Sequence, residues 1–251
     1  MQVVYVIILF IYGVTFGSFF NVVGLRVPTQ TLFKEKRSYC DQCKRTLGWA
    51  ELIPIWSYVF QKGRCKGCGQ KIIVLYPIIE ALTGFLFAYS YVHFGMTRLF
   101  VLALLLIALI IPITVSDIMY QKIPNRILLF FTPLFIIYRM VYPLAHGWSS
   151  LIGALLAFVL VFMIIYISKG GMGIGDLKCY TLFGFVFGAS HFLLLFFLST
   201  LYGVIAGISI MIVRKTGHKT KIAFAPYIGL AALTALYFGE TINQWYIQLF
   251  N

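Results

Sequence analysis

Residues 98–116, RLFVLALLLIALIIPITVS, decide the fold, because no charged side chain follows Arg98 in the run. A helix of about 20 apolar residues spans a hydrocarbon core about 30 Å thick, and this run has that length. Similar runs recur along the chain, which is 61% hydrophobic and 11% charged, against roughly 45–50% and about 25% in soluble domains. The sequence therefore predicts an all-α polytopic membrane protein. A soluble fold would have to bury nearly every helix on all sides.

The apolar runs predict about eight transmembrane helices, over residues 3–24, 72–94, 98–116, 126–144, 149–168, 177–190, 192–213 and 223–239. The sixth run is short and its boundary with the seventh is soft, so seven spans remain an alternative. The first run lacks a charged n-region and a small-residue cleavage site, which favours a retained helix over a cleaved signal peptide.

Basic residues fall on alternate predicted loops. Residues 26–71 carry ten Lys and Arg, and the loops near residues 122–126, 169–178 and 214–221 bring the total to 18 of the 20. By the positive-inside rule these loops are cytoplasmic and both termini are extracytoplasmic. The net charge of +13 then reflects orientation and attraction to anionic headgroups. No nucleic-acid-binding module is recognisable, so we expect the lipid bilayer and not nucleic acid as a partner.

Four cysteines in the one sizeable polar segment form two Cys-x-x-Cys pairs, Cys40 with Cys43 and Cys65 with Cys68, with 21 residues between the pairs. This spacing is typical of a tetrathiolate Zn²⁺ site, and a reducing compartment argues against disulfides. Four thiolates leave no open coordination position, so the ion is expected to be structural and to supply folding energy to a small loop. Cys179 stands alone in an apolar run and is interpreted as a packed hydrophobe.

Three carboxylates lie within or at the edges of predicted spans, where ionisable groups are expensive and mark functional candidates. Asp117 ends the third span, Asp176 begins the sixth, and Glu80 lies inside the second. The two aspartates are predicted on the same side of the membrane, where a pair of carboxyl groups, one acid and one base, can activate water against a peptide carbonyl. The alternative is that each aspartate only caps a helix. Glu80 is interpreted either as pairing with a basic group on a neighbouring helix or as a satisfied structural carboxylate.

Five further stretches, in order along the chain, carry a family resemblance: GSFFNVVGLRVP (17–28), YPIIEALTG (76–84), SDIMYQKIPN (116–125), GMGIGDLK (171–178) and FAPYIGLAAL (224–233). With the cysteine pairs between the first two, the chain resembles the type IV prepilin peptidases, within the GxGD group of intramembrane aspartyl proteases. The last stretch departs from the family's more usual Pro-Phe-Gly-Pro run, so no role is assigned to it.

The resemblance implies that Asp117 and Asp176 are the catalytic dyad of an enzyme in the bacterial cytoplasmic membrane. It would remove the short basic leader of prepilins or pseudopilins, the subunits of pilus, competence and secretion systems, at the cytoplasmic membrane face. The implied domains are a first transmembrane helix (1–25), a four-cysteine zinc-binding domain (26–71) and a transmembrane aspartyl protease domain (72–251).

Many family members with the cysteine-rich loop also methylate the new amino-terminus with S-adenosylmethionine, which is therefore an expected cofactor. No dinucleotide-type glycine motif lies between a strand and a helix, so its binding residues stay unassigned. Gly173 and Gly175 are expected to admit substrate backbone and to adopt dihedral angles that other residues resist, and Lys178 to hold a negative charge or a lipid headgroup. The remaining motif residues with an expected supporting role, in cleavage or methylation, are Asn21, Arg26 and Glu80.

Two other classes of protein remain as alternatives. The first is an ion- or proton-coupled transporter that uses the same aspartates, although these lie at one face and not at the midplane, and no inverted repeat is visible. The second is a zinc-module membrane anchor that recruits assembly proteins.

Overall fold

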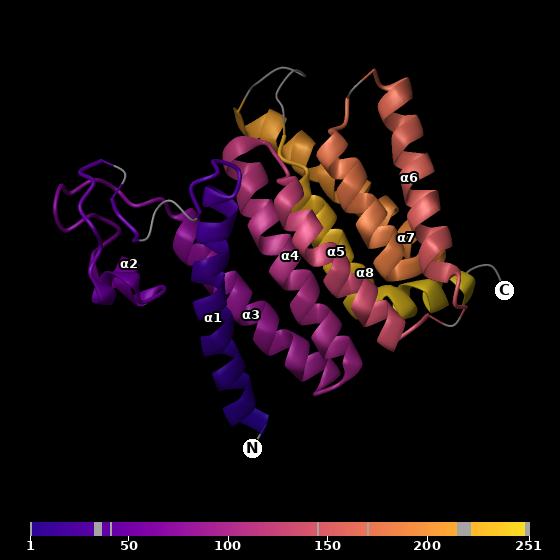
Figure 1. The fold of residues 1–251 in the computed structure, drawn as a ribbon, viewed down its shortest axis with the longest axis horizontal. Coiled ribbons are helices and arrows are strands. Elements are labelled where there is room, and N and C mark those ends of the chain that lie inside the picture. The colour runs from indigo at the N-terminus through magenta and orange to yellow at the C-terminus, as the bar shows by residue number, and fades with distance from the viewer. Residues whose placement is uncertain are drawn as a thin grey trace. The chain divides into compact units, whose positions relative to one another are not determined.

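The computed structural model describes residues 2–32, 37–40, 42–144, 146–169, 171–214 and 222–248 (Figure 1). Within these ranges the secondary structure is helical apart from two isolated β-bridges. The elements are α1 (Gln2–Arg26), η1 (Trp49–Leu52), α2 (Trp56–Phe60), α3 (Leu75–Phe94), α4 (Arg98–Tyr120), α5 (Asn125–Val141), α6 (Ser149–Ile167), α7 (Ile174–Arg214) and α8 (Ala225–Gln248). The predicted all-α class is confirmed.

Every predicted apolar range is occupied by a helix, with ends that differ by a few residues except at the carboxyl end of α8, which extends to Gln248 where the prediction ended at 239. In the described part of the chain, five helices are long and apolar enough to cross a membrane by length and composition, namely α1, α3, α4, α6 and α7. Many large apolar side chains on them are exposed, for example Val3, Leu155 and Phe197. Such a surface is typical of a lipid-facing protein and not of a soluble monomer. Three basic residues of the last predicted cytoplasmic loop, Lys215, Lys219 and Lys221, lie outside the described residues.

Gly188 divides α7 into two helices. Its backbone, at φ 73° and ψ 175°, is a conformation that glycine adopts and other residues resist. The hydroxyl groups of Tyr180 and Ser199 lie 2.6 Å apart on either side of this break, whereas 19 residues of straight helix would separate them by about 28 Å. The chain therefore folds back at Gly188, which lies at the soft boundary between the sixth and seventh predicted spans. This geometry favours two spans there over one.

The chain divides into two compact units, Met1–Val115 and Ser116–Asn251. In the first unit, α1 packs closely on α3 because glycines replace side chains at the contact. A Cβ added at Gly13 would lie 2.7 Å from Cα of Gly84, and one added at Gly17 would lie 2.9 Å from Cα of Glu80. Gly13 and Gly17 are four residues apart on one face, the small-residue spacing that lets membrane helices approach.

In the second unit, α6 packs against the first half of α7 by the same device. A Cβ added at Gly153 would overlap the carbonyl oxygen of Gly184, and one added at Gly184 would overlap that of Gly153. The second half of α7 packs against the segment that leads into α8, where Gly203 makes room for the ring of Phe224. The contact at Gly203 holds the second half of α7 against the start of α8.

Candidate active site and metal centre

Asp117 lies in the last turn of α4 and is buried. Its Oδ2 accepts a hydrogen bond of 2.8 Å from the backbone N–H of Ala225, the first residue of α8. The turn that follows α4 is closed by the hydroxyl of Ser116, which donates to the carbonyl oxygen of Lys122 at 2.6 Å. A helix amino-terminus presents unpaired N–H groups and a partial positive charge, so it holds a carboxylate in a fixed orientation.

Asp176 is the third residue of α7. Its Oδ2 accepts from the backbone N–H of Gly173 at 3.2 Å, while the N–H of Asp176 donates back to the carbonyl oxygen of Gly173 at 3.1 Å. A side chain at the third helical position that reaches back to the N-cap N–H is one half of a capping box. Each aspartate therefore does bond at a helix terminus, as the capping alternative requires, and this fixes the direction of its carboxylate.

Gly173 and Gly175, the glycines of the motif that ends in Asp176, leave room that a side chain would fill. Neither is among the described residues with positive φ, so the expectation that Gly173 and Gly175 adopt unusual dihedral angles is wrong. A Cβ at Gly173 would lie 3.2 Å from Oδ2 of Asp176, and one at Gly175 would lie 3.0 Å from Cβ of Ile123. The GxGD pattern thus leaves room for the carboxylate on one side and for Ile123 on the other.

Lys178 joins two of the sequence motifs. Its Nζ donates to Oδ1 of Asn125, the first residue of α5, at 3.0 Å. Asn125 comes from SDIMYQKIPN and Lys178 from GMGIGDLK. The contact ties the segment after Asp117 to the helix that carries Asp176, and the expectation that Lys178 holds a negative charge or a lipid headgroup stays a prediction.

Asp117 and Asp176 lie in the same compact unit, and the two carboxyl groups are close enough for their charges to interact. No direct hydrogen bond joins them within the described part of the chain. The geometry thus brings together the two residues that the sequence singled out.

The amino-terminus of α8 was missed as part of the site. It belongs to FAPYIGLAAL, the stretch to which the sequence analysis assigned no role, and it supplies the backbone N–H of Ala225 to Asp117. A backbone donor has no side-chain signature, and Pro226 at the second position of α8 was the only signal of a helix start there.

The other motif residues, from α1 and α3, lie in the first unit. The side-chain amide of Asn21 donates to the carbonyl oxygen of Tyr76 at 3.1 Å, and its Oδ1 is buried without a partner among the described residues. Arg26 donates to the carbonyl oxygen of Arg37 at 3.2 Å. These contacts hold the two ends of the polar segment to the helices that flank it.

Glu80 is buried, and its Oε2 accepts from the backbone N–H of Ile55 at 2.7 Å. Within the described residues it forms no ion pair with a Lys or Arg side chain. This contact fits the interpretation of Glu80 as a satisfied structural carboxylate better than the pairing with a basic group, and a contribution to methylation stays a prediction. The physical reason is that a backbone N–H at the start of α2 meets the carboxylate without burying a second charge.

The four cysteines of the polar segment form one cluster whose sulfur atoms all lie within 4.8 Å of one another. The sulfur atoms of Cys40 and Cys68 are 3.8 Å apart, and a tetrahedron with Zn–S bonds of about 2.3 Å has edges of about 3.8 Å. All four are free thiols. The donor set and its spacing therefore fit a tetrathiolate metal site.

Both cysteine pairs sit in the same kind of turn. In the first pair the N–H of Cys40 donates to the carbonyl oxygen of Arg45, and the N–H of Lys44 donates to the carbonyl oxygen of Cys40. In the second pair the N–H of Cys65 donates to the carbonyl oxygen of Gln70, and the N–H of Gly69 donates to that of Cys65. Lys44 and Gly69 both have positive φ. The chain thus builds two equivalent knuckles, one on each side of the metal position.

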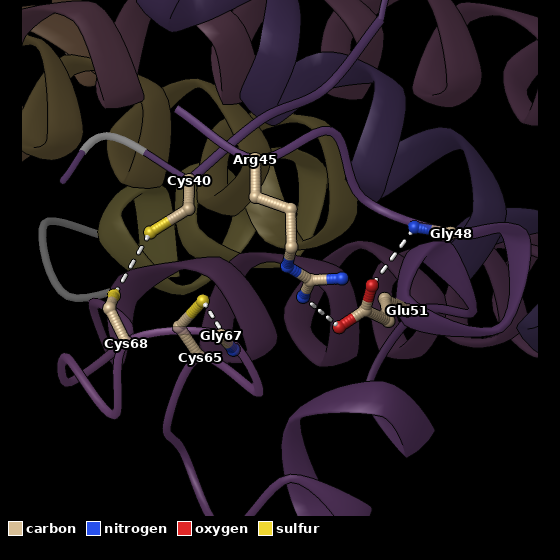
Figure 2. A network of polar contacts seen from close by, with 7 residues as sticks. All are labelled: Cys40, Arg45, Gly48, Glu51, Cys65, Gly67 and Cys68. Atoms are coloured by element: carbon tan, nitrogen blue, oxygen red, sulfur yellow. Dashed lines mark hydrogen bonds and ion pairs between the residues drawn. The ribbon is translucent and has the colours of Figure 1, made fainter. Parts of the chain in front are cut away.

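A charged pair lies beside the cluster (Figure 2). Arg45 Nη2 donates to Oε1 of Glu51 at 2.7 Å, and Oε2 of Glu51 accepts from the N–H of Gly48 at 2.9 Å. The Arg45 hydrogen bond, more than any other contact, lowers the pKa of Glu51. In the cluster itself, backbone N–H groups of Cys68 and Gly67 lower the pKa of the Cys65 thiol to about 6. These hydrogen bonds favour the thiolate, the form that binds metal.

The cysteine cluster and the two aspartates each fall in a segment that matches a known protein family. Residues 11–94 match the family described as bacterial peptidase A24 N-terminal domain, and residues 100–208 match the type IV leader peptidase family. A protein from Bacillus subtilis (strain 168) named prepilin leader peptidase/N-methyltransferase is 38% identical over 242 residues, which cover 96% of this chain and 98% of the relative. A relative of the same name from Legionella pneumophila is 28% identical over 265 residues, covering 94% and 92%. No solved structure matches the chain.

Proposed function

The chain belongs to the type IV leader peptidase family, and we propose from this that it is an aspartyl endopeptidase that removes the short basic leader of type IV prepilins or pseudopilins. The observation that supports the proposal is that Asp117 and Asp176 lie in one compact unit, each with its carboxylate held by a backbone N–H. Both lie in the segment that matches the peptidase family.

In this mechanism a water molecule between the two carboxyl groups attacks the scissile carbonyl. Two neighbouring carboxyl groups do not both ionise readily, so one aspartate is ionised and the other is protonated. The ionised aspartate takes a proton from the water, and the protonated one donates its proton to the carbonyl oxygen. Proton return to the leaving amine then breaks the C–N bond. The N–H groups of Ala225 and Gly173 keep the two carboxylates in fixed directions throughout.

Cleavage is proposed to take place at the cytoplasmic face of the membrane. The alternation of basic loops supports this side, because Asp117 and Asp176 both border loops that carry the Lys and Arg excess. The polar segment with its cysteines falls on the same side, and both termini fall on the other. Thiol labelling of Cys43 in intact cells and in inverted vesicles tests the assignment, since reaction in intact cells alone contradicts it.

A second activity, N-methylation of the new amino-terminus with S-adenosylmethionine, is proposed because the relatives that cover nearly the whole chain are named for both activities. The four cysteines would hold a structural Zn²⁺, which supplies folding energy and no open coordination position. The proposed domains accordingly stay as a first helix (1–25), a four-cysteine zinc-binding domain (26–71) and a transmembrane protease domain (72–251).

The test is a cleavage assay with purified protein in detergent and a prepilin with a basic leader, followed by mass spectrometry. We expect leader removal by the native chain and by Glu240→Gln, which alters an exposed carboxylate outside both motifs, and none by Asp117→Asn or Asp176→Asn. Full activity in either aspartate variant rejects the dyad. A mass gain of one methylene group on the mature amino-terminus, dependent on S-adenosylmethionine, confirms the second activity, and its absence rejects it.

A further inference from the structure

The polar segment between α1 and α3 contains one stretch that is not polar. Residues 52–60, LIPIWSYVF, hold no charged side chain, although the segment on either side of them is rich in Lys and Arg. Three large side chains of α2 lie at helical spacing on one face and are exposed, with exposed fractions of 62% for Trp56, 61% for Val59 and 76% for Phe60. The rings of Trp56 and Phe60 stack on each other at 5.8 Å between centroids.

Two contacts fix the level of this stretch along the helices. The N–H of Ile55, next to Trp56, donates to the buried carboxylate of Glu80, which lies about 8 Å along α3 from Leu75 at a rise of about 1.5 Å per residue. At the same level α1 contributes Gly17, which lies about 13 Å before the end of that helix at Arg26. The stretch therefore turns back alongside the spanning helices, below the level at which they end.

Basic side chains follow this apolar face. Lys62, Arg64, Lys66 and Lys71 are all exposed, and they come directly after α2 in sequence. An apolar face with Trp and Phe, bordered by Lys and Arg, is the composition of segments that lie in the interfacial region of a bilayer. The cations meet anionic headgroups, and the rings reach the start of the acyl chains.

We propose that the face of α2 formed by Trp56, Val59 and Phe60 inserts into the anionic leaflet of the membrane that the chain spans, and so anchors the cysteine-rich segment to the lipid surface. The partner is phospholipid and not a second protein, because Ile55 is bonded to Glu80 of the spanning helix α3 and the charged residues that follow the stretch, up to Lys71, are all basic. The segment then has three attachments to the membrane: α1, α3 and the α2 face between them.

The test uses the full chain with Trp56 as the sole tryptophan, made by replacing the other three tryptophans with Phe, in nanodiscs without any prepilin. Phospholipids brominated on the acyl chain should quench its fluorescence severalfold, and aqueous iodide should quench it severalfold less than in the urea-unfolded chain. Replacing anionic lipid with zwitterionic lipid should restore part of the iodide quenching.

A matched variant places the sole tryptophan elsewhere in the segment, by Gln70→Trp with Trp56→Phe, beside the second cysteine knuckle. Bound metal and elution as a single species show that both variants are folded. Iodide quenching of Trp56 equal to that of the unfolded chain, with no effect of brominated lipid, overturns the proposal. Quenching by lipid that appears only when a prepilin is added also overturns it, because the peptide and not the membrane would then organise this face.

Discussion

Asp117 allows a structural role to be separated from a chemical one, because its carboxylate accepts the N–H of Ala225 at the start of α8. In Asp117→Asn the amide oxygen still accepts that hydrogen bond, so we expect the fold to be kept and cleavage to be lost. In Asp117→Ala the buried N–H at the start of α8 loses its partner, which costs about 1–3 kcal/mol. We therefore expect Asp117→Ala to be destabilised by about 2 kcal/mol, or about 4–8 °C in Tm for a chain of this size.

The assay pairs thermal unfolding in detergent, followed by intrinsic fluorescence, with prepilin cleavage by the same preparations. Asp176→Asn and Asp176→Ala form a matched pair, because Oδ2 of Asp176 also bonds a backbone N–H, that of Gly173. Equal Tm values for the Asn and Ala variants at position 117 would show that the bond to α8 contributes nothing. Retained cleavage in Asp117→Asn would show that the residue is a helix cap and not a catalytic group.

Three further predictions concern the metal site and the motif contacts. Cys40→Ser should lower the zinc content of the purified protein from about one ion per chain. Cys179→Ala, which changes a buried cysteine outside the cluster, should leave the zinc content unchanged, and equal zinc in the two variants would exclude the ligand set. Gly175→Ala should reduce cleavage, because the added Cβ would lie 3.0 Å from Cβ of Ile123. Adding Ile123→Ala to this variant should restore part of the cleavage rate, and a double variant no faster than the single one contradicts the steric argument. Lys178→Met should reduce cleavage more than Lys178→Gln, which can still donate to the amide at the start of α5, as judged from initial rates at saturating substrate; identical losses would point to charge alone.

The sequence predicted the features that depend on composition and spacing. Length and apolarity placed most helices within a few residues of their observed ends, because each span must satisfy its backbone hydrogen bonds internally; the polar last turns of α8, after residue 239, lay outside the predicted range. The cysteine spacing predicted the cluster, since two knuckles supply the four corners of a tetrahedron.

The features that the sequence did not predict depend on contacts between distant segments. The bond from α8 to Asp117 is made by a backbone N–H, which every residue except proline has, so no residue type marks it. For Glu80 the sequence left pairing with a basic group and a satisfied structural carboxylate open, and its observed partner is a backbone N–H 25 positions earlier in the chain. Gly175 was read as a conformational glycine, yet what it provides is room for Ile123, which only a packed structure shows.

The break at Gly188 bears on how the chain enters the membrane. Tyr180 and Ser199 are both completely buried and bond each other across the break. If the first half of α7 left the translocon alone, the phenol of Tyr180 would face hydrocarbon without its partner, which costs several kcal/mol. We expect the two halves to insert together as a helical hairpin, so that assembly of this unit begins with a pairing completed before either helix reaches lipid.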